Sequence, residues 1–237
     1  MQSENNIYAM TQANYPELPL LVVMLTYNDF TVADAAEVFA ECEDSDAEYW
    51  GMKEQPLPLD EMKALFARMK AAGKKTVLEV VAYSEEEGLR GAETAAACGC
   101  DFLMGTKFHK SIADYCRLHD IRYIPFVGTI AGRPSVLTGE VDEIIAEADM
   151  ALSQGAYGVD LLGYRYVGDA VALNKALAAR FPGRVCIAGS VDSYVRLDEI
   201  REAAPAWFTI GSAFFNHKFG DTVCSQINTV CRYLRAR

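Results

Sequence analysis

Short runs of apolar residues recur along the chain, and each is followed by a longer segment in which apolar residues return every three or four positions. The short runs are rich in β-branched and aromatic residues, as buried parallel strands are. The longer segments have the i, i+3, i+4, i+7 spacing of helices that bury one face. The pattern predicts eight strands, at residues 20–27, 47–53, 76–83, 101–107, 122–129, 158–164, 184–190 and 207–213.

The ends of several helical segments carry residues that commonly start or stop helices. Gly73, Gly99 and Gly155 follow helical segments, at the position where a left-handed residue often ends a helix. Thr138 precedes another such segment, and threonine is a frequent first capping residue. We therefore expect helices to stop at the three glycines and one to open at Thr138.

Eight alternations of strand and helix in about 220 residues predict an α/β protein. They fit a single closed (β/α)8 barrel, the TIM barrel, better than an open doubly wound sheet, which usually has fewer strands and two unpaired edges. We expect one domain over residues 1–237, with residues 1–18 as an N-terminal extension. Hydrophobic residues make up 51% of the chain and charged residues 23%, which is enough apolar material for a large core.

The charge of the chain narrows the choice of partners. Its 22 Lys and Arg against 33 Asp and Glu give a net charge of −11, which repels nucleic acid at long range. A small phosphorylated ligand is still compatible with it, because a local cluster of donors can bind phosphate. The sequence shows no targeting segment and no run near the ~20 apolar residues of a membrane span, so we expect no membrane partner.

The seven cysteines lie at positions 42, 98, 100, 116, 186, 224 and 231. They form no C-x-x-C pair, and several occupy apolar positions of predicted elements. We interpret them as reduced thiols and expect a cytoplasmic protein.

Two of the predicted strands end in Gly-Ser, at Gly189–Ser190 and Gly211–Ser212. These are the seventh and eighth strands, after which barrels often bind phosphate, because small residues let backbone N–H groups approach the oxygens. The sequence therefore predicts a phosphate site at these four residues. The alternative is that the glycines only make room for tight turns.

Two stretches resemble a known family. Residues 100–129, CDFLMGTKFHKSIADYCRLHDIRYIPFVGT, are similar to the corresponding part of 2-keto-3-deoxy-6-phosphogluconate aldolases, and IAGSVDS, RLDEI and FTIGSAFF resemble the phosphate-binding end of ribulose-phosphate-binding barrels. The resemblance covers about half of the chain. It implies membership of that superfamily and a phosphorylated ligand in carbohydrate metabolism.

The aldolase mechanism does not transfer residue by residue. The position that matches the Schiff-base lysine of those aldolases is Asp160, which cannot form an imine. The family's catalytic glutamate falls near Glu48 or Tyr49, and its substrate-binding arginine falls on Lys53.

Acidic residues interrupt two of the apolar strands. If side chains alternate along the strand, Asp160, Leu162 and Tyr164 face the barrel axis, whereas Val159 and Leu161 face the helices. Glu79 lies among valines in the third strand. We predict that Asp160 and Glu79 are an acid and a base; the alternative is a structural ion-pair network.

Lysines at strand ends complete the predicted catalytic set. Lys53 and Lys107 follow the second and fourth strands, and either is a candidate partner of the carboxylates. Lys107 is also the remaining candidate for an imine, with a surface or phosphate-contacting role as the alternative.

Four further residues are predicted to contact the substrate: Asn28, Thr129, Tyr164 and Arg165. The three histidines have no zinc-binding spacing, so we expect neither a metal nor another cofactor. A divalent ion on Asp29, Glu79 and Asp160 is conceivable but has no independent support.

Together these features predict an aldolase-like lyase or an isomerase that abstracts a proton next to a carbonyl of a small phosphorylated sugar or keto acid. One alternative is a sugar-phosphate epimerase or decarboxylase of the ribulose-phosphate-binding type. Another is a barrel that senses a phosphorylated metabolite without catalysis. A homo-oligomer is compatible with each.

Overall fold

The computed structural model describes residues 19–132 and 135–236, and in them the main sheet closes on itself as a parallel barrel. The expected extension at 1–18 lies outside the described residues. All eight predicted barrel strands are present, which confirms the TIM-barrel fold. In ring order they are β1 (Leu20–Met24), β12 (Trp207–Ile210), β11 (Val185–Ile187), β10 (Val159–Leu161), β7 (Arg122–Phe126), β6 (Phe102–Lys107), β5 (Lys75–Ala82) and β4 (Tyr49–Lys53).

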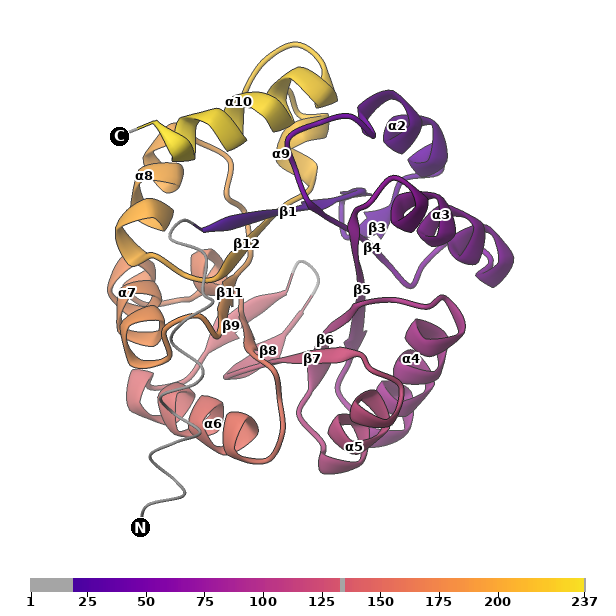
Figure 1. Cartoon of the computed structure of the whole chain (residues 1–237). Coiled ribbons are helices and arrows are strands. Elements are labelled where there is room, and N and C mark those ends of the chain that lie inside the picture. The colour runs from indigo at the N-terminus through magenta and orange to yellow at the C-terminus, as the bar shows by residue number, and fades with distance from the viewer. Residues whose placement is uncertain (1–18, 133–134, 237) are drawn as a thin grey trace, which may run out of the picture.

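Helices surround the ring on its outer side, as Figure 1 shows in a view through the barrel. No helix of the described residues is long and apolar enough to cross a membrane. The helices that follow the barrel strands are α2 (Ala35–Cys42), α3 (Leu59–Ala71), α4 (Glu85–Ala97), α5 (Lys110–Leu118), α6 (Val141–Ser153), α7 (Ala170–Arg180), α8 (Tyr194–Ala203) and α10 (Val223–Arg235).

Helix ends agree with the sequence in three places and differ in one. Gly73, Gly99 and Gly155 follow α3, α4 and α6 with positive φ angles of 76°, 65° and 111°, as expected. Thr138 does not open α6, because it belongs to a strand and its hydroxyl donates a hydrogen bond to the carbonyl oxygen of Thr129. Glu140 is the capping residue of α6 instead.

Two small hairpins and two short helical turns at the strand ends were not predicted. The first hairpin, β2 (Thr26–Tyr27) with β3 (Phe30–Thr31), splits off the end of the strand expected at 20–27. The second pairs β8 (Thr129–Ala131) with β9 (Val136–Thr138). The helical turns are η2 (Gly163–Arg165) after β10 and α9 (Ser212–Phe215) after β12.

The hydrophobic core has an outer and an inner part. The outer part fills the space between sheet and helices, and includes Trp50, Leu103 and Phe208, which have no exposed surface. The inner part fills the barrel itself. At its lower end Phe102 and Trp207 pack edge to face, with ring centroids 6.0 Å apart, so the interior is a packed core rather than a pore.

Two of the seven cysteines form a disulfide, which corrects the expectation that all are reduced. Cys42 at the end of α2 is bonded to Cys224 near the start of α10, with the two Cα atoms 5.0 Å apart. The sequence hides this pair because 182 positions separate its members, whereas ring closure places α2 beside α10 (Figure 1). The other five cysteines are free and buried.

Truncation of Leu103 tests the importance of the outer core. Leu103 has no exposed surface, so Leu103→Ala is expected to lower the free energy of unfolding by about 2 to 5 kcal/mol, because it leaves a cavity. The matched control is Leu118→Ala, since Leu118 is 74% exposed, and it should change this free energy by less than about 0.5 kcal/mol. Urea unfolding measures both, and equal losses would contradict this description of the core.

Candidate active site

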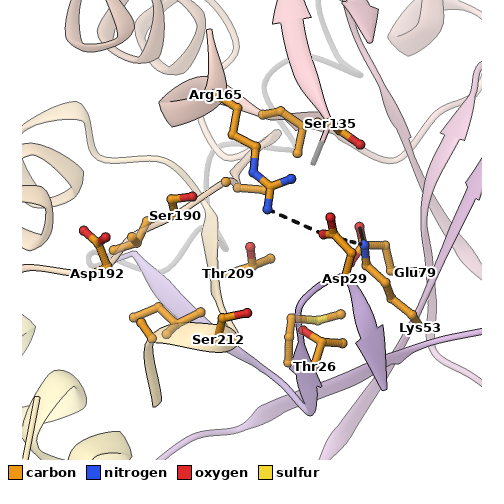
Figure 2. Close-up of a pocket in the computed structure, with 18 of the residues that line it drawn as sticks. Thr26, Asp29, Lys53, Glu79, Ser135, Arg165, Ser190, Asp192, Thr209 and Ser212 are labelled. Atoms are coloured by element: carbon orange, nitrogen blue, oxygen red, sulfur yellow. Dashed lines mark hydrogen bonds and ion pairs between the residues drawn. The ribbon is translucent and has the colours of Figure 1, made fainter. Parts of the chain in front are cut away.

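A cavity of about 230 Å³ opens at the carboxyl ends of the barrel strands. Residues of β1, β4, β5, β6, β7, β10 and β12 line it, together with the first hairpin, η2 and the loop that follows β11. Figure 2 shows Asp29, Lys53 and Glu79 together on one side of this cavity, and Ser190, Asp192 and Ser212 on the other. Residues distant in the sequence therefore converge on one pocket.

Asp160 lies at the bottom of this cavity. Its neighbours Val159 and Leu161 face the outer core, whereas Asp160 lines the cavity, as strand alternation predicts. The residue is 1% exposed, and within the described residues its Oδ1 has no hydrogen-bond partner. Burial raises the pKa of Asp160 well above the usual carboxyl range, Glu79 raises it further and Lys53 opposes both. The raised pKa favours the protonated form of Asp160, which is the form that can donate a proton.

Lys53 lies between two carboxylates. Its Nζ is 3.5 Å from Oε1 of Glu79 and 3.3 Å from Oδ1 of Asp29. Burial disfavours the ammonium, but Glu79 and Asp29 outweigh burial, and the pKa of Lys53 rises above its usual value. Lys53 therefore stays charged and can stabilise negative charge that develops nearby.

Gly105 explains how Glu79 fits into the cavity wall. A Cβ atom at position 105 would lie 2.9 Å from Cγ of Glu79, and Gly105 has a φ of +89°. The pairing of β6 with β7 shifts register between Met104 and Lys107. Close approach of β6 to Glu79 thus requires glycine at this point.

Lys107 is not among the residues that line the cavity. Its ammonium donates a hydrogen bond to the carbonyl oxygen of Gly128, 2.9 Å away, and forms an ion pair with Glu147 of α6. Lys107, the lysine predicted to form an imine, thus contacts Gly128 and Glu147 and does not face Asp160.

The four residues of the predicted phosphate site all line the cavity: Gly189, Ser190, Gly211 and Ser212. Gly189 and Ser190 have φ angles of +89° and +72°, so two successive residues are left-handed. Arg196, which lies in α8, donates a side-chain hydrogen bond to the carbonyl oxygen of Ser190. The two Gly-Ser pairs together form one side of the cavity, which we call the small-residue wall.

Of the four predicted substrate-contacting residues, only Arg165 lines the cavity; Asn28, Thr129 and Tyr164 are not among its lining residues. Arg165 lines the cavity, and its Nη2 is 3.5 Å from Oδ1 of Asp29. Tyr164 does not line it, because β10 gives way to η2 and strand alternation ends there. The Tyr164 hydroxyl instead donates to the carbonyl oxygen of Arg196 at 3.3 Å. Thr129 is exposed in β8 and is also absent from the lining.

The turn of the first hairpin contributes Asp29, which the sequence suggests only as a conceivable metal ligand. Asn28 and Asp29 both have positive φ, 50° and 68°, as a two-residue hairpin turn requires. The backbone N–H of Asn28 donates to Oγ of Ser212 at 3.2 Å, while Asp29 lines the cavity. The sequence contains a signal for this turn, because the Asn28-Asp29 pair lies between two dipeptides that are typical of strands.

Within residues 19–132 and 135–236, no three His, Cys, Asp or Glu side chains are arranged to hold a metal ion. Asp29 and Glu79 contact the ammonium of Lys53.

The fold is shared with several solved enzyme structures. No family model and no curated protein sequence matches the chain. A 4-hydroxy-2-oxoglutarate/2-dehydro-3-deoxyphosphogluconate aldolase from TTHB1 superposes with a TM-score of 0.63 at 17% identity, over 90% of this chain and 94% of that one. Orotidine 5′-phosphate decarboxylase from Pyrococcus horikoshii OT3 gives 0.65 at 12% identity, over 92% and 100%. N-(5′-phosphoribosyl)anthranilate isomerase from Pyrococcus furiosus gives 0.65 at 11%, also over 92% and 100%.

At these identities the comparisons show that the fold is shared. The shared fold agrees with the resemblance to ribulose-phosphate-binding barrels that the sequence indicated. The chain is a TIM barrel whose structural neighbours include an aldolase, a decarboxylase and an isomerase.

The protonation of Asp160 is testable through stability. Because its pKa is raised on folding, the folded state keeps a proton that the unfolded state releases above about pH 4. Its contribution to stability is full below that pH and declines as the pH rises. Relative to wild type, Asp160→Asn should gain about 1.4 kcal/mol of unfolding free energy per pH unit. Urea unfolding from about pH 4.5 to about 6.5 measures this gain, and a constant difference would contradict it.

Proposed function

We propose that the protein is an enzyme that abstracts a proton next to a carbonyl group of a small phosphorylated sugar or keto acid, as an isomerase or a lyase. The observation that supports this most is the presence in one cavity of Asp160, a fully buried acid whose pKa is raised, and of the Lys53–Glu79 ion pair. Two titratable groups of the same type in different environments are the usual means of separating an acid from a base.

Each group has a distinct part in the proposed reaction. The Glu79 carboxylate takes the proton from the carbon next to the carbonyl, and Asp160 gives its own proton to the carbonyl oxygen. The product of these two transfers is a neutral enediol or enol. The ammonium of Lys53 stabilises the negative charge that develops before the second transfer is complete. Glu79 then returns its proton to the neighbouring carbon while the Asp160 carboxylate takes the proton of the other hydroxyl group, so a carbonyl forms at that position and both residues regain their starting states.

The phosphate group of the substrate is proposed to bind at Gly189, Ser190, Gly211 and Ser212. All four line the cavity, and their small side chains leave room for oxygens to approach the backbone. Arg165 is the nearest proposed cationic partner, because its stem packs on Gly189, where a Cβ would lie 2.9 Å from Cγ of Arg165.

The imine-free branch is favoured over a Schiff-base aldolase. An imine needs a neutral amine, whereas the charge of Lys53 is stabilised by two carboxylates and Lys107 is hydrogen-bonded outside the cavity. A ribulose-phosphate-type epimerase or decarboxylase would use the same phosphate end. A sensor without catalysis would keep Glu79 in its ion pair when the ligand binds. A cytoplasmic location and a homo-oligomeric state remain predictions from the sequence.

Replacement of Asp160 tests the acid directly. A thermal-shift screen of phosphorylated sugars and sugar acids first identifies a substrate, since a ligand at ~100 times its dissociation constant adds ~2.7 kcal/mol. Asp160→Asn should then lower kcat by about 10²- to 10⁴-fold and leave the affinity for inorganic phosphate unchanged. The control Asp149→Asn makes the same change on α6, where the side chain is 60% exposed, and should keep full activity. Full activity of Asp160→Asn would refute its role.

Borohydride trapping separates the two chemical branches. Reduction of the protein in the presence of its carbonyl substrate should leave the mass of the intact chain unchanged, because two carboxylates stabilise the ammonium of Lys53 and Lys107 is not among the residues that line the cavity. If a stable adduct forms, peptide mapping of the wild type beside Lys107→Met and Lys53→Met would locate it. An adduct on either lysine would overturn the imine-free mechanism.

A further inference from the structure

The guanidinium of Arg165 lies between the two halves of the cavity. Figure 2 shows it pointing to the cavity centre, with Ser190 and Ser212 on one side and Asp29, Lys53 and Glu79 on the other. Its one ion pair within the described residues is the 3.5 Å contact with Asp29. A guanidinium has five N–H donors in a planar fork, so most of its capacity to bind an anion is unused.

The contact with Asp29 is shared. The same oxygen, Oδ1, accepts a hydrogen bond from Lys53 at 3.3 Å and lies 3.5 Å from Nη2 of Arg165. Lys53 has a second carboxylate partner in Glu79, whereas Arg165 has no second one among the described residues. Of the two cations, Arg165 is therefore the one that an incoming anion can take from Asp29 at the lower cost.

The hairpin turn holds Asp29 in place from both sides. Its neighbour Asn28 is bonded to Ser212 of the small-residue wall, and the hydroxyl of Thr31 donates to the carbonyl oxygen of Lys53 at 2.8 Å. Asp29 thus keeps its position next to Lys53 if Arg165 moves away. Burial disfavours the ionised form of Asp29, but Lys53 and Arg165 outweigh burial and lower its pKa, so the carboxylate competes as an anion.

The cavity as a whole has no excess of positive charge. Among the described residues that line it, the cations are Lys53, Arg165 and Lys218, and the carboxyl groups other than the protonated Asp160 are Asp29, Glu79 and Asp192. Asp192 is paired with Arg196, and Lys218 has no ion pair among the described residues, whereas Lys53 and Arg165 are both paired with carboxylates. An anionic ligand that binds Arg165 must therefore displace Asp29 from it.

We propose that Asp29 is an internal competitor for the anion-binding guanidinium of Arg165, and that it makes the cavity select a phosphate dianion over a single carboxylate. A monocarboxylate only replaces Asp29 by a group of equal charge. A phosphate brings about two charges and three acceptor oxygens, which can reach the guanidinium and the small-residue wall together. The proposal rests on the proposed function only in placing the anionic end of the substrate at that wall.

A double-mutant cycle with inorganic phosphate as the probe tests this selection. By calorimetry, Asp29→Asn should bind phosphate about fivefold to tenfold tighter than the wild type, because the guanidinium is freed. Arg165→Met should bind it at least about tenfold more weakly. In the Arg165→Met background, Asp29→Asn should have no effect. Asparagine tolerates the left-handed turn, and an unchanged Tm of each variant confirms that the fold is kept.

Three results would overturn the proposal. Equal tightening by Asp29→Asn in both backgrounds would show that the variant only removes a negative charge from the cavity. No tightening in the wild-type background would show that Asp29 does not compete. The binding of acetate to the wild type provides the selectivity arm: it should be much weaker than that of phosphate, and equal affinities would also overturn the proposal.

The cycle is independent of turnover. If it behaves as expected and no carbonyl substrate is converted, the selection by Asp29 stands and the proposed reaction fails. If a substrate is converted by way of Asp160 but the cycle shows no coupling, the proposed reaction stands and Asp29 has another role.

Discussion

The pairing of β1 with β4 on one side and with β12 on the other turns a row of strands into a ring. In a closed ring, every second side chain must point toward the axis, and the carboxyl ends of all strands meet at one mouth. Asp160, Glu79 and Lys53 come from three different strands and converge only because of this closure. The disulfide between Cys42 and Cys224 joins the two helices that flank the closing strands.

Removal from water then gives similar groups different properties. Asp160 is buried with an unpartnered oxygen, and burial raises its pKa, whereas Asp29 faces two cations that outweigh its burial and lower its pKa. Lys53 keeps its charge despite burial, because it has a carboxylate on each side. The cavity thus holds a donor, ionised carboxylates and a fixed cation within one small volume, which is the combination that enolisation chemistry requires.

The sequence predicts those features that follow from regular alternation. In a regular strand, a period of two was enough to place Asp160 toward the barrel axis, and Glu79 stands out because it is an acid among valines. The period of two failed where the backbone departs from it: Lys107 follows the irregularity at Gly105, Tyr164 lies in a helical turn, and Asp29 lies in a hairpin turn. Side-chain partners across large sequence separations, such as the disulfide, depend on the closed ring and could not be deduced from the spacing of residues.

The aromatic packing at the lower end of the barrel has a consequence for movement through the molecule. Phe102, Trp207 and Tyr157 pack against one another there, with ring centroids about 6 Å apart. These rings close the barrel at its lower end, so the cavity opens only at the carboxyl ends of the strands among the described residues. Whatever enters to reach Asp160 has to leave by the entrance it used. Departure of one molecule and arrival of the next are therefore mutually exclusive events, and the hairpin that carries Asp29 stands beside their common path.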